Sequence, residues 1–371
     1  MIIGVPKEIK NQEFRVSIIP SFAEKLINNG HSVFVERNAG LNAGFPDEKY
    51  IKVGATVFDV ADEIWDKSEL IVKVKEPLPI EYNKIKEKHI LFTYLHLASN
   101  QKLTEALINS GATCIAYETV QNNNGQLPLL APMSAIAGRM SVLIATNLLQ
   151  KKYGGEGILA SGIPGVEPGN ITIIGAGNVG KNAAFIAKGI GASVTVIDTH
   201  QHTLNSIDKM FGGRVKTTFY SESKIAELIE KTDILICSAL IPGAITPKII
   251  SRNTVGNMKK GSVIIDVSID QGGCCETSKP TTHDAPYFVV SGVLHYCVTN
   301  MPGAYPQTAS IALNNATHQY IEQIANLGLK DALQKDSALR FGLNIYKGNI
   351  TCKPIAKSLK LEYKDLNHSK R

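Results

Sequence analysis

Short apolar runs alternate with amphipathic stretches over the first ~130 residues, which is typical of parallel α/β units. Ser21–Asn29 and Asn100–Asn109 have the apolar spacing of helices. Each is followed by a glycine, Gly30 or Gly111, and glycine readily takes the left-handed conformation that ends a helix. The apolar runs, each a predicted strand, are Ile2–Val5, Ser32–Glu36, Leu70–Val74, Ile90–Leu95 and Thr113–Tyr117.

Two longer helices are predicted further along the chain. The first runs from Pro132 to Lys152, because proline suits a first turn and the pair Gly154 and Gly155 closes the far end. The second is Ala309–Asn326, and it leads the chain back toward the first α/β block. Apolar residues recur at helical spacing in the first of these helices, at Ile136, Met140, Leu143, Ile144 and Leu148.

The α/β rhythm restarts at Asn170. The chain after Leu329 is predicted to be helical as far as Gly342, and the polar residues 362–371 are expected to be frayed. The predicted strands of this second block are Ile171–Ile174, Ser193–Ile197, Ile234–Cys237, Ser262–Val267 and Tyr287–Val290.

A glycine fingerprint follows the first strand of the second block and precedes a predicted helix, Asn182–Gly189. In this GxGxxG motif, Gly175 permits a tight turn, Gly177 lets the backbone approach a pyrophosphate, and Gly180 lets the helix pack on the strand. The helix N-terminus offers unpaired N–H groups to phosphate oxygens. The motif by itself is weak, but its strand–turn–helix context indicates a dinucleotide site.

Asp198 ends the next predicted strand, where a carboxylate accepts hydrogen bonds from ribose hydroxyls and repels a 2′-phosphate. No arginine follows in residues 199–202, so NAD is favoured over NADP. The alternative is that Asp198 only caps a loop.

These observations predict an α/β protein of two Rossmann-like domains with parallel sheets, joined by long helices across a cleft. Residues 1–130 and 305–371 form the expected substrate-binding and catalytic domain, which is discontinuous. Residues 131–304 form the expected NAD-binding Rossmann domain.

Composition narrows the class of protein without naming a function. The chain has 371 residues, 44% of them hydrophobic and 19% charged, as in a packed globular enzyme. The net charge of +6 is spread thinly, so no nucleic-acid stripe is indicated. No apolar run approaches the ~20 residues of a membrane span, and the N-terminus lacks signal-peptide features. Six cysteines without a CxxC motif, two of them adjacent, indicate reduced thiols and a cytoplasmic protein, and make a poor metal set.

Four residues are candidates for catalysis because they lie after predicted strands, where open α/β sheets build their sites. Lys75 and His96 are each predicted to close a strand of the first domain, Arg15 lies in the loop after its first strand, and Asp270 is predicted to end a strand of the second domain. A guanidinium suits a carboxylate, a lysine polarises a ketone, and His or Asp moves protons. Taken singly, each is more often an ordinary surface or hydrogen-bonded residue.

The whole chain resembles the alanine dehydrogenase family, from Met1 to about Gly328. The matching segments are 1–16 (MIIGVPKEIKNQEFRV), 72–77 (VKVKEP), 94–97 (YLHL), 131–134 (APMS), 137–140 (AGRM), 212–215 (GGRV), 242–244 (PGA), 266–273 (DVSIDQGG) and 296–302 (YCVTNMP). The resemblance implies reversible deamination of L-alanine to pyruvate and ammonium with NAD, and a homo-oligomer, usually a hexamer.

Residue roles follow from the same resemblance. Arg15 and Lys75 would bind the substrate carboxylate and carbonyl, and His96 and Asp270 would be the acid/base pair. The implied cofactor contacts are Ser134, Gly175, Gly177, Asn178, Val179, Gly180, Asp198, Ala239, Leu240, Val267, Ser268, Ile269, Asp270, Val298, Thr299, Asn300 and Met301.

Several positions depart from the family pattern, mostly around the adenosine half of the expected cofactor, so they bear on NAD affinity more than on the chemistry. They are Ala135, Ile136, Thr203, Tyr220 and Lys279. Where some relatives place a Glu/His metal pair, this chain has Gln323 and Leu327, so no metal is predicted.

Two alternatives remain from the residues. One is a neighbouring enzyme, a saccharopine dehydrogenase or a soluble transhydrogenase subunit, although a large substrate, a membrane partner and an NADP-binding domain have no evident place here. The other is a catalytically silent NAD(H)-binding regulator, which would not need Arg15, Lys75, His96 and Asp270 together.

Overall fold

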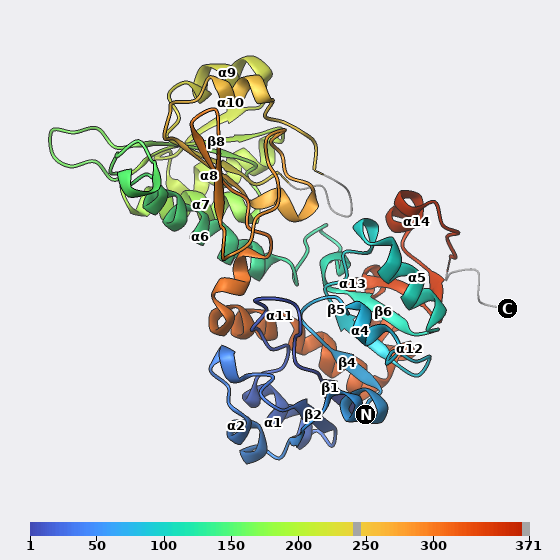
Figure 1. Cartoon of the computed structure of the whole chain (residues 1–371). Helices are drawn as coiled ribbons and strands as arrows, with labels where there is room; N and C mark the ends of the chain where they lie inside the picture. Colours follow the sequence, from blue (N-terminus) through green and yellow to red (C-terminus); the bar gives the residue numbers. More distant parts are fainter. Residues whose placement is uncertain (240–245, 366–371) are drawn as a thin grey trace. The chain divides into compact units, whose positions relative to one another are not determined.

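The computed structural model describes residues 1–239 and 246–365, shown in Figure 1. These residues form two compact units. The first comprises residues 1–133 and 303–365, and the second comprises residues 134–239 and 246–302. Within the described ranges, no helix has the length and apolar character needed to cross a membrane.

The first unit is built on an eight-stranded sheet in the order β15-β14-β6-β5-β4-β1-β2-β3. β1 to β6 are parallel, whereas β14 runs antiparallel to β6 and β15 antiparallel to β14. The strands are β1 (Ile2–Val5), β2 (Ser32–Glu36), β3 (Thr56–Phe58), β4 (Leu70–Val72), β5 (Ile90–Thr93), β6 (Thr113–Ala116), β14 (Leu343–Tyr346) and β15 (Asn349–Ile350).

β1 lies in the interior of this sheet, between β4 and β2, and its buried apolar residues face both sides. Ile3 and Val5 are fully buried, and a Cβ added at Gly4 would lie 2.4 Å from the Ser68 hydroxyl. Continuous apolar strands of this kind are typical of parallel sheets with helices on both sides. Glycine at position 4 therefore allows the segment ending α3 to pack directly on the strand.

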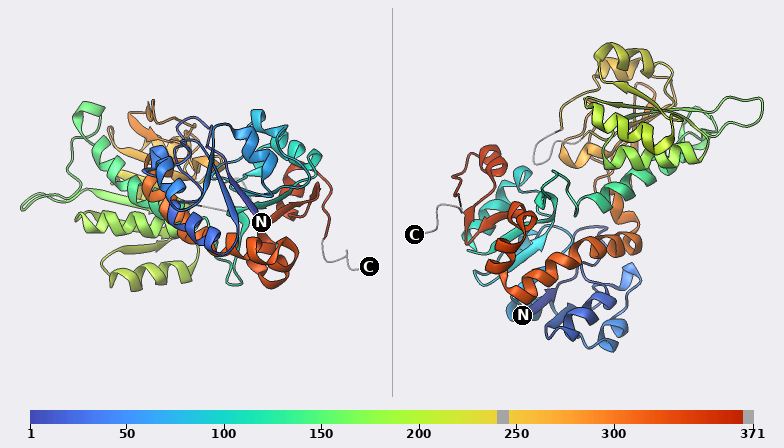
Figure 2. Two further views of the ribbon diagram at one scale, coloured as in Figure 1. Left: turned by 90° about the horizontal axis from the view of Figure 1, so that it is seen from below. Right: turned by 180° about the vertical axis from the view of Figure 1, so that it is seen from behind.

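Helices surround the first sheet. α11 packs beside α1, and in Figure 2 (right) it is the long orange helix. Residues of α3, α5 and α14 share one apolar core with the strands. The helices are α1 (Pro20–Asn28), α2 (Asp47–Lys52), α3 (Ala61–Lys67), α4 (Pro79–Tyr82), α5 (Gln101–Asn109), α11 (Pro306–Leu327), α12 (Leu329–Lys335), α13 (Ser337–Gly342) and α14 (Lys353–Leu359).

The second unit is built on a seven-stranded sheet in the order β12-β13-β11-β10-β7-β8-β9. All neighbours are parallel except β12, which runs antiparallel to β13. The strands are β7 (Asn170–Ile174), β8 (Ser193–Asp198), β9 (Lys216–Phe219), β10 (Ile234–Cys237), β11 (Val263–Asp266), β12 (Tyr287–Val290) and β13 (Val293–Tyr296).

Two apolar cores cover the two faces of this sheet. α6, α7 and α8 contribute to one core, and α9 and α10 to the other. Figure 1 shows these two groups of helices on opposite sides of the sheet. α6 (Ala131–Leu148) carries the chain from the first unit into the second. The remaining helices are α7 (Asn178–Gly189), α8 (Gln201–Phe211), α9 (Glu222–Ile229) and α10 (Arg252–Gly256).

The predicted α/β class with two Rossmann-like sheets is confirmed, with antiparallel pairing at one edge of each sheet, through β12 in the second unit and β14 and β15 in the first. Gly30 and Gly111 take the left-handed conformation expected after their helices, at φ 86° and 72°. The short strands β3, β9, β13, β14 and β15 were not predicted.

Several predicted boundaries were wrong. α6 ends at Leu148 rather than Lys152, and α7 begins at Asn178, directly after the second glycine of the fingerprint. Residues 362–365 are not frayed: Tyr363 packs on the core of the first unit, and the Lys364 amide donates to the Ile350 carbonyl at 2.8 Å. Tertiary contacts thus order a segment whose own composition is polar.

Substitutions at Met140 and Leu143 on α6 test which apolar side chains stabilise the second unit. Met140 is 3% exposed within the apolar core, whereas Leu143 is 50% exposed. Met140→Ala should lower the free energy of unfolding by about 2–5 kcal/mol, and Leu143→Ala by less than about 0.5 kcal/mol. Urea unfolding followed by circular dichroism measures both. Equal losses would mean that Leu143 is covered in solution.

Candidate active site

Three neighbouring strands of the first unit place the candidate substrate-binding residues at one edge of its sheet. β1, β4 and β5 are adjacent and parallel, so their carboxyl ends point the same way. Arg15 lies in the loop after β1, Lys75 after β4 and His96 after β5. The sheet order also reverses between β1 and β4, and such a switch point is where open α/β sheets bind ligands.

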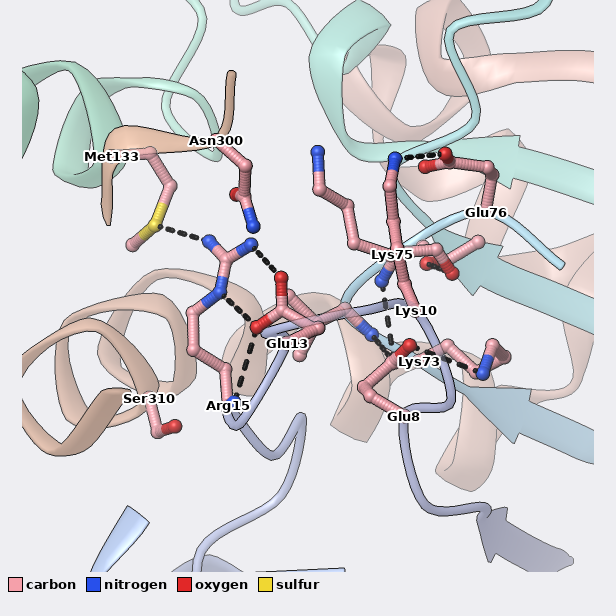
Figure 3. A network of polar contacts seen from close by, with 12 residues as sticks. Glu8, Lys10, Glu13, Arg15, Lys73, Lys75, Glu76, Met133, Asn300 and Ser310 are labelled. Carbon is pink, nitrogen blue, oxygen red and sulfur yellow. Dashed lines mark hydrogen bonds and ion pairs between the residues drawn. The ribbon is translucent and has the colours of Figure 1, made fainter. Parts of the chain in front are cut away.

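Arg15 is held by a buried carboxylate. Its guanidinium donates from Nε and Nη2 to the two oxygens of Glu13, at 2.6 and 2.5 Å, and lies 3.2 Å from the Met133 sulfur (Figure 3). Burial disfavours the charged guanidinium, but the charge and hydrogen bonds of Glu13, together with Tyr94 and Glu8, outweigh it and raise the pKa of Arg15. The loop itself is fixed to α11, because the Val16 amide donates to the Ser310 hydroxyl at 2.9 Å.

Lys75 was predicted to close a strand, and this was wrong because β4 ends at Val72. Lys75 is 7% exposed, and no hydrogen-bond or ion-pair partner for its ammonium is found among the described residues of its unit. Next to it, Glu76 pairs with Lys10 at 2.6 Å. Burial raises the pKa of Glu76, but the charges of Lys75 and Lys10 outweigh it and lower that pKa.

His96 also lies beyond its predicted strand, since β5 ends at Thr93. It takes a left-handed conformation at φ 49°, which is uncommon for a residue with a side chain. Its amide donates to Glu118 Oε1 at 2.6 Å, and its ring stacks on Tyr94 with centroids 6.0 Å apart. Such backbone strain persists only where surrounding contacts fix it, and it gathers at functional sites.

The second unit forms the predicted dinucleotide turn between β7 and α7, beside the point where its strand order reverses. Gly175 has φ 97°, and a Cβ there would lie 2.8 Å from the Ser238 carbonyl. A Cβ at Gly180 would lie 1.8 Å from the Gly175 carbonyl. At Gly177, the N-cap of α7, a Cβ would meet nothing within 4 Å. The turn is therefore tight inside and open outside, which fits a pyrophosphate.

Asp198 ends β8 and faces this turn. Its carboxylate accepts the Ala176 amide at 2.7 Å and the His200 amide at 2.9 Å. Burial raises the pKa of Asp198, but these hydrogen bonds outweigh burial and lower it, so the group stays ionised. Asp198 thus orders the turn and keeps an anionic oxygen at the position expected for ribose hydroxyls.

Asp270 lies in a short 3-10 helix, η5 (Val267–Gln271), rather than at a strand end. The Asn300 amide donates to its carboxylate oxygens at 3.2 and 3.3 Å. The Ser268 hydroxyl donates to the Ala239 carbonyl at 2.7 Å. The structure therefore ties together three of the predicted cofactor segments. Leu240 lies outside the described residues.

Other predicted cofactor contacts are placed less favourably for side-chain contact. Ile269, Val298 and Met301 are 4%, 1% and 3% exposed, so little of each residue is open to a ligand. Ser134 lies on α6 and is partly exposed, and Asn178 and Val179 begin α7. Val267 and Thr299 are likewise partly exposed.

Three buried thiols come together near η5. Cys237, Cys274 and Cys275 have sulfur atoms within 4.8 Å of one another, and those of Cys237 and Cys275 are 3.5 Å apart. The sequence argument from adjacent cysteines missed this cluster because Cys237 comes from β10. Three thiols are a donor set for soft metal ions. The absence of a metal stays a prediction.

Several supporting residues were missed by the sequence argument. Glu13, Glu8 and Glu118 fix the three loops of the first unit, and Ser238 donates to the Ile174 carbonyl at 2.8 Å beside the glycine turn. Only Glu13 carried a signal, since it lies two positions from Arg15. The others act across long sequence separations that no local pattern reveals.

Comparisons with known proteins show which family this chain resembles. The alanine dehydrogenase/PNT N-terminal domain family matches residues 4–137, and the corresponding C-terminal domain family matches residues 141–353. The chain belongs to the alanine dehydrogenase/PNT family. The resemblance stated from the sequence is therefore confirmed.

Named relatives span the same length. The chain is 46% identical to an alanine dehydrogenase of Mycolicibacterium smegmatis, over 98% of both chains. It is 48% identical to alanine dehydrogenase 2 of Staphylococcus aureus, over 100% of this chain and 99% of the relative. A solved L-alanine dehydrogenase structure is 47% identical, with a TM-score of 0.92 over 97% of this chain and 99% of that chain. A transhydrogenase from Sinorhizobium meliloti, 24% identical with a TM-score of 0.79 over 95% of this chain and 99% of that chain, shares the fold.

Gly180→Ala tests the dinucleotide turn. The added methyl overlaps the Gly175 carbonyl, so the turn must deform and NADH affinity should fall at least about tenfold, roughly 1.4 kcal/mol. Gly189→Ala is the matched control on the same helix, because its Cβ meets nothing within 4 Å. Fluorescence titration with NADH measures both variants. Unchanged affinity in Gly180→Ala would remove the turn from the cofactor site.

Proposed function

We propose that this chain is an NAD-dependent L-alanine dehydrogenase in which Arg15 and Lys75 bind the substrate and His96 and Asp270 move protons. The reaction is L-alanine + NAD⁺ + H₂O ⇌ pyruvate + NH₄⁺ + NADH + H⁺. Full-length membership of the family supports the activity. The observation that carries the residue assignment is the placement of Arg15, Lys75 and His96 after three adjacent parallel strands.

NAD is the cofactor, and the open glycine turn and Asp198 are suited to its pyrophosphate and ribose. When bound, it supplies the hydride acceptor or donor. The chain's own part is to hold the ligand without a competing side chain at Gly177, and to present the ionised Asp198. That carboxylate also explains the preference for NAD, since a 2′-phosphate would be repelled.

Arg15 and Lys75 would orient the 2-oxo acid. Glu13 holds the Arg15 guanidinium through Nε and Nη2, and Nη1 lies beside the Met133 sulfur, so the charged group is held in a fixed position where it would bind a substrate carboxylate. The Lys75 ammonium, buried and close to the charged Glu76, would polarise the carbonyl oxygen. Both cations are desolvated, which strengthens their attraction for an anionic substrate.

His96 and Asp270 would carry protons as ammonia adds to the carbonyl carbon and water leaves. The strained His96 backbone is fixed by Glu118, and its ring stacks on Tyr94. Asp270 is likewise fixed through the Asn300 amide. Positioned acids and bases of this kind contribute about 10²–10⁴-fold to a rate.

Assembly, location and metal use are inferred with the function. We infer a hexamer from the family resemblance. We infer a cytoplasmic location from the six free cysteines. Exposed apolar residues on the loop before β7, Leu159, Ile163 and Val166, support association between copies. Gln323 and Leu327 on α11 provide no carboxylate or imidazole, so we infer activity without a metal.

The substrate assignment is tested by NADH oxidation at 340 nm. Pyruvate with ammonium should support turnover, and 2-oxoglutarate should support at least about tenfold less, because a second carboxylate would need a further cation. Glyoxylate, which lacks the methyl group, measures how much that group contributes. Turnover with 2-oxoglutarate and none with pyruvate would overturn the assignment.

Lys75→Ala and His96→Ala should each lower kcat/KM for pyruvate by about 10²–10⁴-fold. NADH affinity should stay within about twofold, because both residues belong to the first unit, whereas the glycine turn belongs to the second. Steady-state rates beside NADH fluorescence titration separate the two effects. If NADH binding collapsed while rates at saturating NADH recovered, the residue would belong to the cofactor site.

A further inference from the structure

Three buried charged side chains, Glu8, Lys73 and Glu81, form a cluster next to the segment that carries Lys75. The Lys73 ammonium lies 3.2 Å from Glu8 Oε2 and 3.0 Å from Glu81 Oε1 (Figure 3 shows Glu8 and Lys73). The side chains of Glu8, Lys73 and Glu81 are 4%, 0% and 5% exposed. Two carboxylates therefore share one ammonium inside the protein, leaving a surplus negative charge.

The surplus charge is taken up by backbone amides of one short segment, residues 74–78. Glu8 Oε1 accepts the amide of Val74 at 2.6 Å and that of Lys75 at 3.2 Å. Glu81 Oε2 accepts the Leu78 amide at 2.8 Å. Burial and the nearby charges of Glu13 and Glu81 raise the pKa of Glu8, although Lys73 and the Val74 amide oppose them.

The carbonyl of Lys75 is fixed as well. The fully buried Thr93 hydroxyl donates to it at 2.9 Å, from the end of β5. Both peptide groups of Lys75 therefore bond to buried side chains, one from the loop after β1 and one from β5. The lysine extends from a backbone that is held at both of its polar groups.

Stability alone is a weak explanation for this arrangement. Removing three charged groups from water costs several kcal/mol per ion, and buried ion clusters are often no more stable than apolar packing. What they fix well is geometry. From these contacts we infer that Glu8 is a positioning residue for Lys75, which sets where the Lys75 ammonium meets the substrate carbonyl. This inference rests on the proposed role of Lys75.

Glu8→Gln is the direct test, because the side chain keeps its shape and loses one acceptor. An amide has a single acceptor oxygen, so it cannot serve both Lys73 and the two backbone amides. A displacement of about 1 Å in a positioned group costs up to ~100-fold, so kcat/KM for pyruvate should fall by 10- to 100-fold. NADH affinity should not change.

A double-mutant cycle separates positioning from a general structural effect. In the Lys75→Ala background, Glu8→Gln should change kcat/KM by less than about twofold, because the group it positions is absent. The same fold-loss in both backgrounds would overturn the inference. Thr93→Val provides a second, uncharged variant that should follow the same pattern, in case Glu8→Gln fails to fold.

Glu69→Ala is the matched control. Glu69 precedes the same strand, β4, and its carboxylate accepts a backbone amide, that of Ile2, at 2.8 Å. It lies at the opposite end of the strand from Lys75, so kcat/KM should be unchanged. A comparable loss in Glu69→Ala would show that any break in the backbone contacts of β4 lowers activity, and would overturn the role of Glu8.

Amide hydrogen exchange followed by mass spectrometry gives a readout that needs no turnover. Glu8→Gln should speed exchange across residues 73–78, and Glu69→Ala should not. Unchanged exchange in Glu8→Gln would overturn the positioning role even in a fully active enzyme. If exchange responds while the unmodified protein fails to convert pyruvate, the proposed function fails and the structural link between Glu8 and the Lys75 loop stands.

Discussion

Parallel strand pairing requires that every strand of a βαβ series end at the same edge of its sheet. In the first unit this constraint gathers Arg15, Lys75 and His96, which lie far apart in sequence, after the adjacent strands β1, β4 and β5. In the second unit it gathers the glycine turn after β7 with the segments after β10 and β11. The chemistry of each unit depends on this arrangement, since none of these residues has a local reason to meet another.

Buried carboxylates hold the nearby loops in defined conformations. Glu13 holds the Arg15 guanidinium, Glu118 holds the backbone of His96, and Asp266 accepts the amides of Ser268 and Cys274 at the base of η5. Burial and the neighbouring Cys275 raise the pKa of Asp266 to about 6, which reflects how little water reaches it. In each case an anion inside the protein satisfies donors that a loop would otherwise leave unpaired.

The family comparison and the physical reading support each other in different ways. Identity of 46–48% over nearly the whole chain identifies the family, but it does not say how a side chain is held. The contacts in the structure show how side chains are held. Asp198 orders the glycine turn while remaining ionised, and Tyr94 stacks on the ring of His96. Positions that depart from the family pattern also have local roles, as Lys279 shows by lying over the Phe288 ring at 4.5 Å.

Much of this molecule follows from the sequence by itself. Long apolar runs, helix-ending glycines and the GxGxxG motif predicted the α/β class, most central strands and the cofactor turn, because periodicity and glycine geometry are local properties. Tertiary structure alone decided that Lys75, His96 and Asp270 lie beyond their strands, that Cys237 joins Cys274 and Cys275, and that Glu8 fixes the loop of Lys75. Those outcomes depend on which distant groups satisfy a buried amide or charge, and no pattern of neighbouring residues contains that information.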